Sequence, residues 1–121
     1  MATLTPLLKL TSADATADPL ALSETDTLTV QAPSVSLAKA SILHTAPTNI
    51  LTAAANTLDT YVYLKNTDAT NFVEVKTDAA AVLIQLNPGE FAFFPVQGAI
   101  GLELQASTAT CVIDYGYWTK G

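Results

Sequence analysis

Two side chains of this chain could carry chemistry near neutral pH, His44 and Cys111. His44 is the only residue suited to acid–base catalysis at that pH, and it lies beside an expected strand end in SILHTAPTN. A catalytic histidine needs a nucleophile or a carboxylate beside it, and no GxSxG, HExxH, phosphate-loop or Cys–His pattern accompanies this one. Cys111 precedes Val112 and Ile113 in an apolar strand. We therefore interpret His44 as a loop or edge histidine, Cys111 as an inert buried thiol, and the protein as non-enzymatic.

Metal binding is the next chemistry that the residue types allow. A zinc site needs three or four ligands, and His44 and Cys111 supply two. The acidic residues of the first quarter lack the ligand spacing of an EF-hand loop, which leaves a calcium loop or a solvated acidic face: Asp14, Asp18, Glu24 and Asp26. Four further carboxylates fall in expected strands or strand edges, at positions expected to face outward: Glu74, Glu90, Glu103 and Asp114. The sequence therefore predicts neither a metal nor a cofactor.

The charge balance excludes two classes of partner. Eleven acidic residues stand against five lysines and no arginine, and the net charge is −6. Binding to nucleic acid depends on clustered basic residues that release counterions, and these lysines are scattered. The same lack of positive charge argues against an anionic membrane surface. No apolar run of about 20 residues predicts a membrane helix, and the N-terminus lacks the pattern of a secretory signal. The lone cysteine predicts no disulfide within the chain, so we expect a soluble protein that is made in a reducing compartment or is indifferent to its redox state.

The elements that position these residues are expected to be strands. Residues 60–65 alternate Tyr61 and Tyr63 with Val62 and Leu64, and residues 72–76 alternate in the same way after a polar turn. These two segments predict a hairpin. Residues 81–86 lead to Asn87–Glu90, where the Pro-Gly pair predicts a type II turn.

The remaining strands follow from similar patterns. In residues 90–96 Phe91 and Phe93 share one face and Phe94 takes the other, and Pro95 indicates an edge, a bulge or a strand end. Residues 100–106 and 110–118 are the last two expected strands. Residues 4–10 form a strand interrupted at Pro6, residues 11–24 a loop or extended arm, residues 28–30, 35–43 and 48–51 further strands, and residues 53–56 a turn.

Together these patterns predict an all-β fold. No segment keeps a helical apolar period over three turns, so we expect little helix. Eight or nine short strands at a spacing of about ten residues are typical of an antiparallel β-sandwich, jelly-roll-like in form. We expect residues 1–25 to form an N-terminal strand or extended arm and residues 26–121 the sandwich domain.

The aromatic residues and the hydropathy indicate a binding surface. Half of the chain is hydrophobic and 13% is charged. Few charged side chains remain to cover the exposed surface, which suits a subunit that buries area against others. Five aromatic residues with polar tips suit core packing, a subunit interface or a sugar-stacking platform: Tyr61, Tyr63, Tyr115, Tyr117 and Trp118.

Residues 61–118 carry a family resemblance. Three stretches carry it, in this order along the chain: YVYLKNTDATNFVEV, LNPGEFAFFPV and LELQASTATCVIDYGYW. The short motifs within them are Leu64–Thr67, Asn71–Val75, Pro88–Glu90 and Ala106–Tyr117. In this order the chain resembles small virion proteins of tailed bacteriophages. The resemblance covers about half of the chain and implies a β-sandwich subunit, such as a head decoration (cement) protein that sits as a trimer on the capsid exterior.

The leading hypothesis is thus a capsid decoration protein that bridges coat subunits. Its expected partners are further copies of the chain, in a homotrimer, and the major capsid protein. Residues 2–25 are the expected arm, and the residues expected to contact partners are Leu4, Leu7, Leu8, Tyr115, Tyr117 and Trp118. A tail, baseplate or fibre component is the first alternative. A carbohydrate-binding module that uses the five aromatic residues is the second.

Overall fold

The computed structural model describes residues 2–31, 37–52, 57–77 and 79–121, and within them all regular elements are β-strands. The chain divides into two compact units. One comprises residues 1–32 together with Gly121, and the other comprises residues 33–120.

The N-terminal unit is a two-stranded antiparallel ribbon. Its base pairs β1 (Ala2–Leu4) with β4 (Leu28–Val30), and its longer part pairs β2 (Leu7–Ser12) with β3 (Leu20–Thr25). The strand therefore breaks near Pro6, as predicted, since proline cannot donate to a ladder. Residues 20–25 form a strand and not the loop expected within residues 11–24. The sequence lacks alternation strong enough to show this, but Leu22 lies directly opposite Leu10 across the ribbon.

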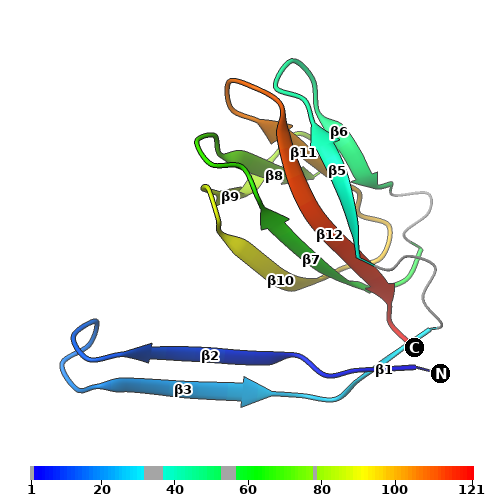
Figure 1. The fold of residues 1–121 in the computed structure, drawn as a ribbon. Coiled ribbons are helices and arrows are strands. Elements are labelled where there is room, and N and C mark those ends of the chain that lie inside the picture. Colours follow the sequence, from blue (N-terminus) through cyan, green and yellow to red (C-terminus); the bar gives the residue numbers. More distant parts are fainter. Residues whose placement is uncertain (1, 32–36, 53–56, 78) are drawn as a thin grey trace. The chain divides into compact units, whose positions relative to one another are not determined.

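The second unit is a β-sandwich of two four-stranded antiparallel sheets (Figure 1). The first sheet has the order β10-β7-β12-β5 and the second the order β6-β11-β8-β9. The strands run β5 (Ala38–Ile42), β6 (Thr48–Leu51), β7 (Thr60–Asn66), β8 (Val73–Thr77), β9 (Val82–Leu86), β10 (Phe91–Val96), β11 (Leu102–Ala106) and β12 (Cys111–Thr119).

The connections are those of a jelly roll. Every connection from β5 to β12 crosses between the sheets except β8–β9, which is a hairpin within one sheet. The predicted all-β, jelly-roll-like sandwich is therefore confirmed, with eight strands in the sandwich and four more in the ribbon. The expected turn at residues 53–56 and part of the expected strand at 35–43 lie outside the described residues.

The predicted hairpin of residues 60–65 and 72–76 is wrong. These segments are β7 and β8, and they belong to different sheets. Both strands bury alternate residues, so Val62 and Leu64 face the sandwich interior from one layer and Val73 and Val75 from the other. A polar turn marks a reversal of the chain, but it does not show whether the reversal stays within one sheet or arches between two.

Alternation along the strands supplies the core. The inner faces contribute fully buried aliphatic side chains, and the half-buried rings of Phe94, Tyr115 and Tyr117 pack against them. Cys111 is buried in this core, as predicted. The Asn87–Glu90 turn also has the expected form. Gly89 has φ of 83°, and the Glu90 N–H donates to the Asn87 carbonyl at 2.9 Å.

Candidate functional site

The outer face of the first sheet gathers aromatic rings from three strands that are distant in sequence. The pairing register places Phe91 beside Lys65, Phe93 beside Tyr63, and Pro95 beside Tyr61, which is followed by Trp118. Each pair lies two residues from the next, so all of these side chains project from the same face. We call the rings of Tyr61, Tyr63, Phe91, Phe93 and Trp118 the aromatic face.

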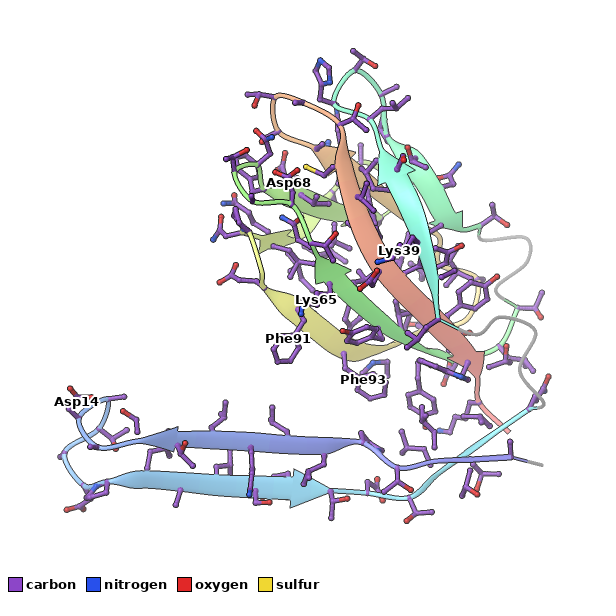
Figure 2. All side chains as sticks on the ribbon, in the orientation of Figure 1. Asp14, Lys39, Lys65, Asp68, Phe91 and Phe93 are labelled. Carbon is purple, nitrogen blue, oxygen red and sulfur yellow. The ribbon has the colours of Figure 1, made fainter. Side chains whose placement is uncertain are left out.

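Two rings of the aromatic face are exposed, and those of Tyr61, Tyr63 and Trp118 are half-buried. The side chains of Phe91 and Phe93 are 64% and 39% exposed, and both project from β10 away from the sandwich interior (Figure 2). The rings of Tyr61 and Phe93 lie nearly parallel, with centroids 6.2 Å apart and an angle of 14° between their planes. β10 is an edge strand, as Pro95 predicts, so the rings also reach the rim of the sheet.

A glycine lets the indole ring lie over β12. A Cβ atom at Gly116 would stand 2.9 Å from the Cη2 atom of Trp118, closer than real side chains approach. The Trp118 ring therefore occupies the space that a side chain at this position would fill. Gly116 is also the neighbour of Tyr63 across the sheet, and the side chain of Leu37 approaches the same space, with its Cδ2 atom 3.3 Å from that Cβ position.

Charge on this side of the sandwich is sparse and lies to one end. Lys65 is aligned with Phe91 at the end of the aromatic face opposite Trp118, and its side chain lies beside the Phe91 ring (Figure 2). It forms no ion pair within the residues that the structure describes. Asp114 lies directly opposite Lys65 on β12, and its carboxylate is bound by the Lys39 ammonium of β5 at 2.7 Å.

The centre of the outer face of the second sheet, on β8 and β11, is polar instead, while the edge strand β9 carries the exposed apolar side chains of Val82 and Leu83. In register across it lie Glu103 beside Lys76, and Gln105 beside Glu74, which is followed by Gln85. The Lys76 ammonium donates to Gln105 Oε1 at 2.6 Å. The expectation that Glu74, Glu103 and Asp114 point outward is thus confirmed. The two outer faces of the sandwich differ in chemistry, because aromatic rings gather on the first and no strand of the second sheet contains an aromatic residue.

A pocket of about 330 Å³ adjoins the Tyr61 end of the aromatic face. Its lining includes the ring of Tyr61 and the polar side chains of Asp59, Gln97 and Lys120. The Asp59 carboxylate accepts a hydrogen bond from the Gly98 N–H at 2.9 Å, which fixes the rim. The pocket brings polar groups of both charges next to an aromatic ring.

The ribbon carries a second apolar surface. Of its residues, Leu8 alone is among those expected from the sequence to contact partners. Alternation across the β2–β3 pair places four leucines on one side, in three rows: Leu8 beside Glu24, Leu10 beside Leu22, and Ser12 beside Leu20. We call Leu8, Leu10, Leu20 and Leu22 the leucine face. Leu8 and Leu10 are 46% and 43% exposed.

The six residues expected to contact partners lie in different environments. Leu7 and Leu8 are exposed on opposite sides of the ribbon, and Leu4 is half-buried opposite Leu28. Trp118 belongs to the aromatic face. Tyr115 and Tyr117 point to the other side of β12, where their rings stack with centroids 6.5 Å apart and pack against the core. Sequence reasoning did not include Phe91 and Phe93 in the site, although their alternation in residues 90–96 was the signal that could have added them.

The residues that first suggested chemistry lie apart from these surfaces. His44 is exposed between β5 and β6, and its carbonyl accepts a hydrogen bond from Gln105 Nε2 at 3.0 Å. Burial raises the pKa of the Cys111 thiol, and the Asp68 carboxylate raises it further. The backbone N–H groups of Asn71 and Thr70 donate to Asp68 and lower the pKa of that carboxyl.

Acidic residues form no cluster with metal-binding geometry in the described ranges. Asp14 lies in the loop at the tip of the ribbon (Figure 2), where it accepts a hydrogen bond from Ser12 Oγ at 3.2 Å. No group of three His, Cys, Asp or Glu side chains suited to a metal ion occurs among the residues described. Those residues also include no helix able to cross a membrane.

No protein-family model matches the chain, and no curated protein or solved structure is significantly similar to it.

Proposed function

We propose that this protein is a structural subunit that works by binding other protein subunits, as a head decoration protein of a tailed bacteriophage does. The contrast between the two outer faces of the sandwich carries the proposal. One face presents aromatic rings, whereas β8 and β11 of the other present charged and amide groups, with the exposed Val82 and Leu83 confined to its edge strand β9. Exposed aromatic side chains are enriched at the centres of protein interfaces.

The proposed mechanism is the addition of buried apolar area across seams between coat subunits. Each aromatic ring removed from water contributes about 1.5–3 kcal/mol, so several rings together can hold neighbouring subunits against outward pressure. The ribbon supplies a second apolar surface, so one chain can engage two neighbours at once. The protein acts in this role as a homotrimer on the outer surface of the capsid, beside the major capsid protein.

Co-sedimentation with purified capsids tests the proposal. We expect the wild-type chain to pellet with capsids and a Phe91→Ser, Phe93→Ser variant to remain in the supernatant. Leu83→Ser is the matched control, because Leu83 is 56% exposed on β9 of the other sheet. Failure of the wild type to bind capsids, or equal loss in the control, would contradict the proposal.

A tail, baseplate or fibre component is the first alternative within the virion. A tail component could bind its neighbours through the same two apolar surfaces, so these surfaces do not distinguish a location on the head from one on the tail. Gold or antibody labelling of intact particles separates them: label over the head supports decoration, and label confined to the tail supports the alternative.

A carbohydrate-binding module is a second candidate, which the pocket beside Tyr61 favours. Aromatic rings stack against sugars, and Asp59, Gln97 and Lys120 offer hydrogen bonds to hydroxyl groups. Of the five aromatic residues expected in such a platform, Tyr61, Tyr63 and Trp118 share the aromatic face, whereas Tyr115 and Tyr117 lie on the inner side. Glycan-array binding that disappears in Trp118→Ala would support this candidate.

A further inference from the structure

We infer that the leucine face of one copy docks on the aromatic face of a second copy. The inference rests on the proposed function, because it names the partner through which the subunit forms its own oligomer. Both surfaces are exposed in the single chain, with Leu8 and Leu10 nearly half exposed and Phe91 64% exposed. A two-stranded ribbon is marginally stable in water by itself, so it needs a surface to pack against.

The two surfaces have the same dimensions. The β2–β3 pair is six residues long, and so is β10, which pairs along its whole length with β7. Six strand residues extend about 20 Å. The ribbon is two strands wide, so it can lie along β10 and β7 over Phe91, Phe93, Tyr61 and Tyr63, while Trp118 on β12 borders the contact.

The rows of side chains also correspond. On the ribbon the order is Leu8 with Glu24, Leu10 with Leu22, and Leu20 with Ser12. On the sheet the order is Phe91 with Lys65, Phe93 with Tyr63, and then Tyr61 with Pro95 and Trp118. Both sets repeat every two residues, which gives the rows equal spacing. Apolar rows therefore meet apolar rows in the middle of the contact.

Each surface ends in a charged row: the row of the ribbon holds Glu24, and the row of the sandwich holds Lys65 opposite Asp114, whose carboxylate is bound by Lys39. Glu24 ends the leucine face, and Lys65 ends the aromatic face. Only one orientation of the ribbon brings these two charges together while Leu10 and Leu22 cover Phe93 and Tyr63. Charge pairs at a rim contribute more to orientation than to affinity, so the pair selects this direction.

The contact joins different surfaces of the two copies. Each copy then offers a vacant leucine face and a vacant aromatic face, and successive copies close into a ring when the rotation permits. A three-membered ring would have a mass of about three times 12.7 kDa. This arrangement accounts for a trimer without any further interface.

Disulfide trapping in the full-length chain tests the contact. One chain carries Glu24→Cys, a differently tagged chain carries Lys65→Cys, and the two are mixed and mildly oxidised. We expect a covalent species that contains both tags. Ser23→Cys replaces Glu24→Cys in the matched control, since Ser23 is exposed on the opposite side of the ribbon. Cys111 is buried and does not compete for oxidation.

Three results would overturn the inference. They are the absence of a mixed disulfide, equal trapping of the Ser23→Cys control, and a monomeric internal disulfide in a chain that carries both Glu24→Cys and Lys65→Cys. The last result would place the ribbon on its own sandwich.

A charge exchange provides a second readout by light scattering. Glu24→Lys and Lys65→Glu should each weaken self-association several-fold, and the double variant should restore it. No restoration would contradict the predicted orientation. Capsid co-sedimentation is measured on the same samples. Oligomers that form but do not bind capsids would refute the proposed function alone. Capsid binding by a chain that never self-associates would refute this inference and the homotrimer, and would leave capsid binding standing.

Discussion

Replacing Asn66 with alanine should be among the most destabilising single changes in the sandwich. The Asn66 side chain is fully buried at the end of β7, and its amide group forms three hydrogen bonds to two other segments of the chain. Its Nδ2 group donates to the carbonyls of Asn71 at 2.9 Å and Leu86 at 3.0 Å, and its Oδ1 atom accepts from the Asp68 N–H at 3.0 Å. Asp68 and Asn71 lie in the loop after β7, so the side chain joins that loop to the end of β9.

The magnitude follows from those three bonds. Each contributes about 1 kcal/mol net, and a buried carbonyl left without a donor costs about 1–3 kcal/mol. We expect Asn66→Ala to lose about 3–5 kcal/mol, a large part of the roughly 5–15 kcal/mol that stabilises an ordinary domain. Asn66→Asp should lose at least as much at neutral pH, because a carboxylate cannot donate to the two carbonyls.

Urea unfolding followed by circular dichroism at one protein concentration measures the loss. With a slope of about 1.5 kcal/mol per molar urea, a loss of 3 kcal/mol lowers the midpoint by about 2 M. Asn49→Ala is the control, because Asn49 is exposed on β6 and should change stability by less than about 0.5 kcal/mol. A loss below about 1 kcal/mol in Asn66→Ala, at an unchanged slope, would refute the assignment of Asn66 as a structural link.

Four further changes test the local geometry. Gly98→Ala should cost about 1–3 kcal/mol in thermal unfolding, because its Cβ would lie 2.8 Å from the Thr57 carbonyl oxygen, and a stability equal to wild type would contradict that crowding. Gly89→Ala should cost about 1 kcal/mol, since φ of 83° strains a side chain in otherwise open space, and Gly89→Asn should cost less; equal losses would argue against this backbone strain. Hydrogen bonds lower the pKa of Asp68 in the folded chain, so they stabilise the fold at a pH above the ordinary pKa of 3.8, and this stabilisation is lost as the pH falls through the lower pKa of the folded state. The urea midpoint of the wild type should therefore exceed that of Asp68→Asn by less at pH 2 than at pH 5. A difference that stays constant over this range would contradict the stabilisation by these hydrogen bonds. The Cys111 thiol should resist a thiol reagent at neutral pH until urea unfolds the chain, whereas rapid labelling of the folded protein would contradict its burial.

Much of the local structure follows from the sequence because it depends on neighbours along the chain. Alternation in residues 60–65 separates Tyr61 and Tyr63 from Val62 and Leu64, and the structure keeps that division. The Pro-Gly pair produces the turn before β10, since proline restricts one φ and Gly89 tolerates a positive one. The shortage of charge indicates an exposed apolar surface, but it does not locate that surface.

Which strands pair with each other depends on contacts between segments that are distant in sequence. β7 and β8 follow each other along the chain and yet belong to different layers, because each buries its apolar side against the other sheet. Asn66 reads as a turn residue in the sequence, and only the packing around it makes it a buried link.

The candidate site shows the same division. The sequence by itself determines an all-β chain, the facing of each alternating strand and the lack of a catalytic or metal-binding motif. The tertiary structure decides which outward residues meet, because pairing of β10, β7 and β12 joins Phe91 and Phe93 to Tyr61, Tyr63 and Trp118. It also separates Trp118 from its neighbour Tyr117, since successive residues of a strand point to opposite sides. A surface of this kind arises from register between distant segments, and register is set by the packing of both faces at once.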